Sequence, residues 1–229
     1  MKNVLIIIFL LPCYLSAQIV INEIAPNNRY FSDEDSIYPD WIEIMNIGVY
    51  DINLAQYSIS DNSNNVTKWL FPDTVIYTGE KLVVFASEKN RRCFDCPDTG
   101  AYLHTNFKLS SGENLFLYNN TGELLDSVKI KEVHAGDVMA RIPDGGEWCL
   151  SNTPTPFAVN DVVCYTDYAN APEFITAPGN YPGGLEVYLS GSDIYYTIDG
   201  DWPAIAGLPY DSAITITANT VIKMVTEKP

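Results

Sequence analysis

Histidine and basic residues are scarce in this chain. It has 2 histidines and 13 lysines and arginines against 29 aspartates and glutamates, which gives a net charge of −16 at pH 7. Binding to nucleic acid or to an anionic membrane depends on attraction to phosphate, and a chain with this charge is repelled by phosphate. The composition therefore argues against nucleic-acid partners. It leaves an extracellular protein, a cation or a neutral polysaccharide as candidate partners.

Long hydrophobic runs are also lacking. Beyond residue 11 no segment approaches the about 18 consecutive apolar residues that a membrane-spanning helix needs, so we expect no membrane insertion. The apolar run at 4–11 is too short to span a bilayer, and it follows the single basic residue Lys2. The small residues Ser16 and Ala17 come next, as they do before a cleavage site.

This layout predicts a secretory signal peptide over residues 1–17, with cleavage before Gln18. The alternative is a lipoprotein signal with Cys13 as the lipidated residue, which the preceding Pro12 fits poorly. Cleavage removes Lys2 and no acid, so the mature chain has 12 basic and 29 acidic residues and a net charge of −17. We expect an exported protein, located outside the cell or at the cell surface.

Helical periodicity is missing as well, because no window of a dozen residues keeps helical spacing unbroken. Short alternating or β-branched segments, bounded by Gly, Pro, Asn or Asp, follow one another instead. They predict strands at 19–24, 41–46, 56–60, 68–71, 81–87, 114–118, 125–130, 185–189, 193–198, 214–217 and 220–225. With 47% hydrophobic and 12% aromatic residues the chain is folded rather than disordered, and its fold class is all-β.

Proline and glycine clusters divide the strand pattern into two parts. The pattern is interrupted at 143–146 (PDGG) and again at 154–156 (PTP). We therefore predict a β-sandwich domain at 18–160, a linker at 161–171 and a small β domain at 172–229. The second domain is close to the lower size limit for an independent core. We expect it either to lean on the first domain or to belong to a longer chain.

Four cysteines remain after cleavage of the signal peptide: Cys93, Cys96, Cys149 and Cys164. An even number in an exported chain favours disulfides, here a Cys93–Cys96 loop staple and a Cys149–Cys164 bridge. The C-x-x-C spacing at 93–96 leaves a redox site or a zinc half-site as alternatives. No βαβ pattern surrounds this motif and no histidine accompanies the second pair, so we favour structural disulfides.

The order of motifs in the first part resembles a lamin tail domain. The carrying segments are 19–26 (IVINEIAP), 40–44 (DWIEI), 53–61 (NLAQYSISD), 68–72 (KWLFP), 79–87 (GEKLVVFAS), 104–113 (HTNFKLSSGE), 141–145 (RIPDG) and 153–156 (TPTP). This resemblance covers about 18–160 and implies an immunoglobulin-like β-sandwich. In bacteria such domains look like adhesive or targeting modules of exported proteins.

The remainder is similar to the small β domain at the C-termini of chitobiases and β-hexosaminidases. The carrying residues are 172–174 (PEF), 181–185 (YPGGL), 194–200 (IYYTIDG), Pro203, Tyr210 and 214–222 (ITITANTVI). The resemblance implies a second, small β-sandwich-like domain. In similar proteins the two domains often precede a spore-coat-protein-H-type kinase domain, so this chain is alternatively the N-terminal accessory part of a larger exported enzyme.

The residues predict no catalytic centre. Nucleophilic catalysis needs a base beside a serine or cysteine. His104 lies in a segment that matches the lamin tail pattern, which implies a structural role, and His134 lies in a polar turn. The serines at 110–111 lack the Gly-x-Ser-x-Gly elbow. The glycosidases that carry the second domain keep their catalytic carboxylates in a separate, much larger barrel.

Two binding features are candidates. The acidic loop that contains Asp33, Asp35 and Asp40 offers oxygen ligands for Ca²⁺, although it lacks EF-hand spacing and a solvated loop without cofactor is the simpler reading. Trp202, which follows a turn at 199–200, is the candidate ligand-binding aromatic residue. We expect a secreted, non-catalytic binding, adhesion or spacer module, or alternatively a carbohydrate-binding module.

Overall fold

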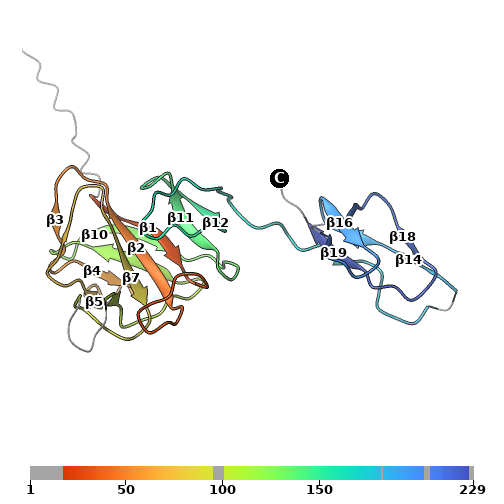
Figure 1. Ribbon diagram of the computed structural model, residues 1–229, viewed down its shortest axis with the longest axis horizontal. Coiled ribbons are helices and arrows are strands. Elements are labelled where there is room, and N and C mark those ends of the chain that lie inside the picture. Colours follow the sequence, from red (N-terminus) through yellow and green to blue (C-terminus); the bar gives the residue numbers. More distant parts are fainter. Residues whose placement is uncertain (1–17, 95–100, 182, 204–206, 227–229) are drawn as a thin grey trace, which may run out of the picture. The chain divides into compact units, whose positions relative to one another are not determined.

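The computed structural model describes residues 18–94, 101–181, 183–203 and 207–226 (Figure 1). The chain divides into two compact units, Met1–Thr166 and Asp167–Pro229. The division falls within the segment 161–171 that the sequence predicts to be a linker. Nearly all regular structure is strand, which confirms the all-β fold class. Among the described residues, no helix has the length and apolar character needed to cross a membrane.

The first unit is built on a six-stranded sheet, which we call sheet A. Its strands, in spatial order, are β12 (Glu147–Ser151), β11 (Val138–Ile142), β1 (Ile19–Ala25), β2 (Asp40–Asn46), β7 (Lys81–Ala86) and β8 (Leu103–His104). Neighbouring strands are antiparallel except β7 and β8, which run parallel. A bulge at Asn22 interrupts the pairing of β1 with β2.

A second sheet, sheet C, completes the immunoglobulin-like sandwich. Its order is β10 (Leu124–Lys129), β9 (Asn114–Tyr118), β4 (Ser58–Ser60) and β5 (Trp69–Leu70). A short pair formed by β3 (Ile52–Asn53) and β6 (Val75–Ile76) lies outside the two sheets. Residues 119–122 form the β9–β10 hairpin turn, in which Gly122 has a φ of +81°.

Both faces of sheet A are covered. All seven residues of β1 are buried. Because side chains alternate along strands, Ile42 and Val84 point to one face and Trp41 and Phe85 to the other. We call the second face the outer face. Its apolar half consists of Ala25, Trp41, Val83, Phe85, Val138 and Ala140, with Phe31, Tyr102 and Ile142 packed against it.

The sequence analysis missed three strands of sheet A, namely the two-residue strand β8 and the longer strands β11 and β12. The residues 143–146, which we expected to interrupt the strand pattern, are the turn of the β11–β12 hairpin, closed by a 2.7 Å bond from Gly146 N to Pro143 O. Gly145 takes a φ of +70°, which explains the glycine at this position. The two flanking strands were missed because turn residues inside a hairpin and turn residues at a domain end have the same composition.

The second unit consists of three small sheets. They are β13 (Glu173–Phe174) with β15 (Leu189–Ser190), β14 (Leu185–Val187) with β18 (Ile214–Ile216), and β17 (Leu208–Pro209), β16 (Ile194–Thr197) and β19 (Lys223–Thr226) in that order. The single strand expected at 185–189 is divided at Tyr188, because β14 and β15 pair with different strands. Val187, Leu189, Ile194 and Ile214 form the buried core.

Candidate functional site

The acidic loop between β1 and β2 is folded around Asp33, which is 4% exposed. Its carboxylate accepts hydrogen bonds from the backbone N–H of Asp35 at 2.9 Å and of Ile37 at 3.2 Å, and it forms an ion pair with Lys89. Asp35 pairs with Lys89 and Arg91, and the Lys89 hydrogen bond lowers the pKa of Asp35. Charge pairs therefore hold the loop in place, although Asp35 itself is exposed to solvent.

Glu34, His104 and Ser87 form a hydrogen-bonded chain beside this loop. His104 Nε2 lies 3.0 Å from Glu34 Oε1, and His104 Nδ1 lies 2.8 Å from Ser87 Oγ. Burial lowers the pKa of His104, so the ring is neutral, with Nε2–H donating to the carboxylate and Nδ1 accepting from the hydroxyl. Burial acts to raise the pKa of Glu34, but bonds from its own backbone, His104 and Arg91 outweigh it.

These residue types also make up a hydrolase triad, but the arrangement differs from one. In a triad Nε2 contacts the serine and Nδ1 contacts the acid, the reverse of what is found here. The His104 ring is fully buried and stacks on Phe85 with centroids 5.3 Å apart. Ser87 Oγ already accepts a bond from Lys89 N at 3.3 Å. The chain holds the acidic loop against β7 and β8, which is a structural task.

The acidic loop was the candidate calcium site, with Asp33, Asp35 and Asp40 as the predicted ligands. The potential ligand atoms of Asp33, Glu34 and His104 lie within 4.8 Å of one another. The sequence did not predict that His104 lies next to this loop. Each of the three groups is already bonded to Lys89, Arg91 or Ser87. Asp40, the third predicted calcium ligand, instead accepts a bond from Leu109 N.

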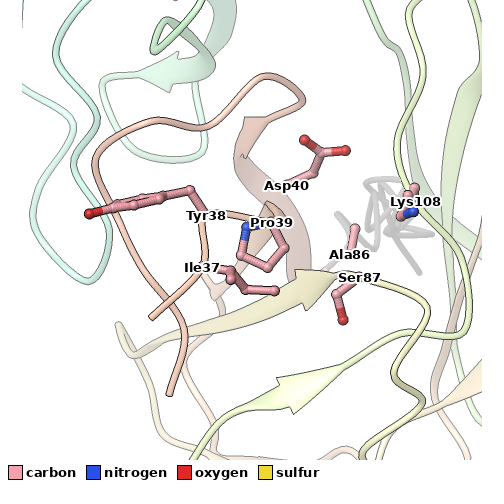
Figure 2. A pocket seen from close by; sticks show the side chains of 7 residues that line it. All are labelled: Ile37, Tyr38, Pro39, Asp40, Ala86, Ser87 and Lys108. Atoms are coloured by element: carbon pink, nitrogen blue, oxygen red, sulfur yellow. The ribbon is translucent and has the colours of Figure 1, made fainter. Parts of the chain in front are cut away.

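Asp40 lines a surface pocket of about 380 Å³ next to the acidic loop. Figure 2 shows this pocket between the loop, the end of β7 and Lys108, with Tyr38 and Pro39 on one side. Burial raises the pKa of Asp40 to about 6, against the opposing effects of Leu109 N and Lys108. Lys108 is directed to Glu88, at 2.9 Å. The pocket offers one weakly acidic carboxyl to a polar group of a ligand.

A second group of acids lies on the outer face of sheet A, where Glu23 and Glu43 are paired across β1 and β2 and fully buried. Lys81 lies 3.7 Å from Glu43 and 2.7 Å from Asp144, and Asn22 Nδ2 donates to Glu43 and Asp144. Burial raises the pKa of Glu23 to about 7, and burial also raises the pKa of Glu43. We call Glu23, Glu43, Asp144 and Lys81 the carboxylate cluster.

The carboxylate cluster binds the chain that follows β12, which we call the return segment (residues 152–160). Glu23 accepts bonds from Thr155 N at 2.9 Å and Thr155 Oγ1 at 3.0 Å. Glu43 accepts a bond from Phe157 N at 2.7 Å, and Asn160 N donates to Asp144 at 3.2 Å. The buried acids therefore act as acceptors for backbone N–H groups that no strand satisfies.

A disulfide joins Cys149 of β12 to Cys164. Next to it, Leu150 and Tyr165 exchange backbone bonds of 2.7 and 3.0 Å. Cys93 is disulfide-bonded, but its expected partner Cys96 lies outside the residues that the structure describes, so the Cys93–Cys96 pairing stays a prediction. The predicted signal peptide at 1–17 also lies outside the described residues.

The tryptophans divide as follows. Trp41 and Trp69 are buried in the first unit, and Trp148 is half-buried under the Arg141 guanidinium, 4.8 Å from its ring centroid. Trp202 is 57% exposed. It does not line any of the three described cavities. Its exposure agrees with a surface role, but no described groove surrounds it.

The second unit has two adjacent cavities of about 390 and 520 Å³ that share Gly179, Tyr181 and Leu185. The smaller one is mainly apolar and includes Phe174. The larger one is lined by uncharged residues, and its polar side chains include Asn180, Thr217, Asn219 and Thr220. Sequence reasoning missed this site, for which the glycines at 183–184 after Tyr181 were the available signal.

Two family models match the chain. The model described as Lamin Tail Domain matches residues 14–132, just over half of the chain, and the model described as Chitobiase/beta-hexosaminidase C-terminal domain matches residues 176–229. No curated protein matches it. The identity and order of the two matches confirm both resemblances inferred from the sequence. The first match ends before β11, β12 and the return segment, although β11 pairs with β1 in the same sheet.

Proposed function

Because this chain belongs to the lamin tail domain family, we propose that it is an exported, non-catalytic binding or spacer module that acts at the cell surface. Both matched families are immunoglobulin-like modules without a catalytic centre. Such modules hold or position other molecules through their loops and faces rather than by chemistry on a substrate. The partner that fits is an extracellular protein or a polysaccharide.

The observation that carries this proposal is that titratable side chains of the first unit are already engaged in internal hydrogen bonds. Glu34 and His104 hold the acidic loop, and Glu23 and Glu43 hold the return segment. A general acid or base has to reach a substrate proton, whereas His104, Glu23 and Glu43 are fully buried. These groups support a rigid scaffold, and a rigid scaffold suits binding or spacing.

Export is tested by expressing the full chain in a Gram-negative host and analysing periplasm, medium and cytoplasm separately. We expect the protein outside the cytoplasm, with an N-terminus at Gln18 by mass spectrometry. Recovery of the uncleaved chain in the cytoplasm alone would contradict the export proposal. Substitution of an apolar residue in the run at 4–11 by lysine should then retain the precursor, because it shortens the hydrophobic segment.

The non-catalytic assignment is tested with a fluorophosphonate probe, which labels activated serines. We expect no labelling of Ser87, because its hydroxyl is held by His104 and Lys89 N. Labelling of Ser87 that disappears in Ser87→Ala and in Glu34→Gln would show an active hydrolase and overturn the assignment. Binding to the cell surface is measured separately. The mature chain, residues 18–229, is labelled with a fluorophore, and its saturable attachment to intact cells is recorded.

Carbohydrate binding is a second candidate for the partner class. The observation that favours it is the pair of uncharged cavities that share Tyr181. Trp202, the aromatic residue predicted from the sequence, stays a candidate on the basis of its exposure alone.

A further inference from the structure

Tyr181 is the aromatic residue that lines both the apolar and the polar cavity of the second unit. The two cavities, together with the Tyr181 ring that both share, are called the Tyr181 groove. The ring is 42% exposed. Cavities of this size, with an aromatic wall and a few polar groups, are typical of small-molecule sites.

The Tyr181 ring is held in place before any ligand arrives. Its hydroxyl donates to Ala177 O at 2.5 Å. A Cβ atom added at Gly179 would lie 3.2–3.4 Å from Cε2, Cζ and the hydroxyl oxygen of Tyr181, so the side chain packs directly on the glycine backbone. A fixed ring loses little conformational entropy when a ligand stacks on it. The loop therefore presents a preorganised aromatic surface.

The polar cavity provides hydrogen-bonding groups with no charge. Its side chains include Asn180, Thr217, Asn219 and Thr220. Within the described part of the chain, Thr220 Oγ1 bonds Ala218 O, whereas no hydrogen bond involves the side chain of Asn180, Thr217 or Asn219. Two amides and a hydroxyl can thus donate and accept hydrogen bonds at the same site.

The apolar cavity provides the complementary surface. Phe174, Pro178, Leu185 and Val187 line it together with Tyr181, and the exposed Phe174 ring is 48% accessible. Among the described residues that line the two cavities there is no Asp, Glu, Lys or Arg. In a chain with 29 acidic residues, an uncharged groove with both characters is a distinct surface.

We propose that the Tyr181 groove binds a neutral polysaccharide, a proposal that rests on the binding role given above and names its partner. A sugar ring has an apolar face of C–H groups and a rim of hydroxyls. The aromatic ring matches the face, and the uncharged amides and hydroxyls match the rim. Anionic polymers are disfavoured by the net charge of the chain, and no charged side chain lines the groove to hold an ionic group.

The test uses purified residues 18–229 and measures depletion from solution by insoluble chitin, cellulose, curdlan and mannan, with polygalacturonate as the anionic comparison. We expect retention on at least one neutral polymer, release by its soluble hexaose, and no retention on polygalacturonate. Tyr181→Ala should weaken binding by at least about tenfold, since it removes the stacking surface. Asn219→Ala should weaken it by a smaller factor.

Three variants make the result specific. Tyr181→Phe keeps the ring and should keep most of the affinity. Tyr188→Ala removes a similarly exposed ring, 49% accessible, that does not line the groove, and it should bind as the parent does. Trp202→Ala distinguishes the groove from the other exposed aromatic site. The thermal midpoint of each variant is measured first, and only variants that unfold at the same temperature as the parent are compared. A loss of binding is then not a loss of folding.

The proposal is overturned if no neutral polymer retains the protein, or if Tyr181→Ala binds as well as the parent. Loss of binding in Trp202→Ala with full binding in Tyr181→Ala also overturns it and moves the site to Trp202. If the protein attaches to intact cells but no neutral polymer retains it, the polysaccharide proposal is wrong and the general binding function still stands. If the protein is not exported, the proposed function at the cell surface is wrong, whether or not a polymer retains the protein.

Discussion

The two units of this protein treat polar side chains in opposite ways. The first unit buries Glu23, Glu43 and His104 completely and uses them to hold loops onto sheet A. Within its described residues, the second unit has a core of four buried hydrophobic residues and leaves the amides of Asn180 and Asn219 at its surface. Buried polar groups that are fully bonded rigidify a fold, whereas exposed and unbonded ones are available to a ligand.

This difference indicates a division of labour. In the first unit, the buried groups Glu23, Glu43 and His104 are engaged in internal bonds, which makes it a scaffold that holds its loops in one defined arrangement. In the second unit, Gly183 and Gly184 take φ values of +100° and +105° beside Tyr181, so the loop follows a path that other residues rarely adopt. The first unit thus provides rigidity, and the second provides the groove for which we propose a ligand.

Replacing the buried tryptophan Trp41 should have the largest effect on stability, because it opens a cavity in the core of the first unit. Trp41 is fully buried and packs on the outer face of sheet A. Trp41→Ala should lower the free energy of unfolding by about 3–5 kcal/mol, measured by denaturant titration. The matched variant Trp202→Ala, at a 57% exposed position, should change it by less than about 0.5 kcal/mol. Equal effects of the two variants would contradict the burial pattern.

Loss of the disulfide should have the next largest effect. Cys149 and Cys164 are 15 residues apart, and their bridge removes conformational freedom from the unfolded chain. The double variant Cys149→Ser, Cys164→Ser should be less stable by about 3 kcal/mol, measured as the shift of the urea midpoint. Reduction of the parent with dithiothreitol should shift it in the same direction. A midpoint that stays the same in both cases would show that the bridge is not part of the folded state.

Because the first unit buries the carboxylate cluster, its stability should depend on pH. The pKa of Glu23 is about 7 in the folded protein and close to 4.5 when exposed, so the folded state binds more protons between these values. Stability should therefore fall as pH rises from about 4.5 through 7, by on the order of 2–3 kcal/mol for this group. Chemical denaturation at pH 5 and pH 8 measures the difference.

Glu23→Gln keeps the hydrogen bonds to Thr155 without the buried charge. It should flatten the pH dependence and stabilise the protein at pH 8 relative to the parent. Glu132→Gln, at an exposed position, is the control and should follow the parent profile. If Glu23→Gln shows the same slope as the parent, the cluster does not bind the proton that its burial predicts.

The smallest effect is expected from calcium. Asp33 and Asp35 are neutralised by Lys89 and Arg91, so a divalent ion has to displace cations that the fold already provides. The thermal midpoint should be the same within error in millimolar calcium and in chelator. A site filled at ten times its dissociation constant would stabilise the folded state by about 1.4 kcal/mol, which calorimetry resolves. Such a shift would reinstate the acidic loop as a calcium site.

Much of the fold could be read from local sequence patterns. The short β-branched and apolar runs at 19–24 and 114–118 predicted β1 and β9 almost to the residue, because such runs, bounded by turn residues, are typical of buried strands. The Cys149–Cys164 pairing followed from the even number of cysteines and their positions. The hairpin of β11 and β12 was missed, since its turn has the composition of a linker.

The candidate sites were less accessible to sequence reasoning. The three aspartates of the acidic loop stood out by density, but the sequence did not show that Lys89 and Arg91, more than 50 residues away, neutralise two of them, Asp33 and Asp35. Trp202 stood out as an aromatic residue beside a turn, whereas Tyr181 stood among many tyrosines. Only the packing of its side chain on Gly179, in the lining of two cavities, distinguishes Tyr181.

The all-β class, the order of the two domains and the positions of most strands could be predicted from the sequence, because they depend on local patterns and on ordered motifs. Which polar groups come into contact depends on the folded arrangement of distant segments. Glu23 binds Thr155 across 132 residues and Glu43 binds Phe157 across 114. A hydrogen bond depends on the final position of two atoms and leaves no periodic trace in either segment, so these contacts emerge only when the sandwich has folded.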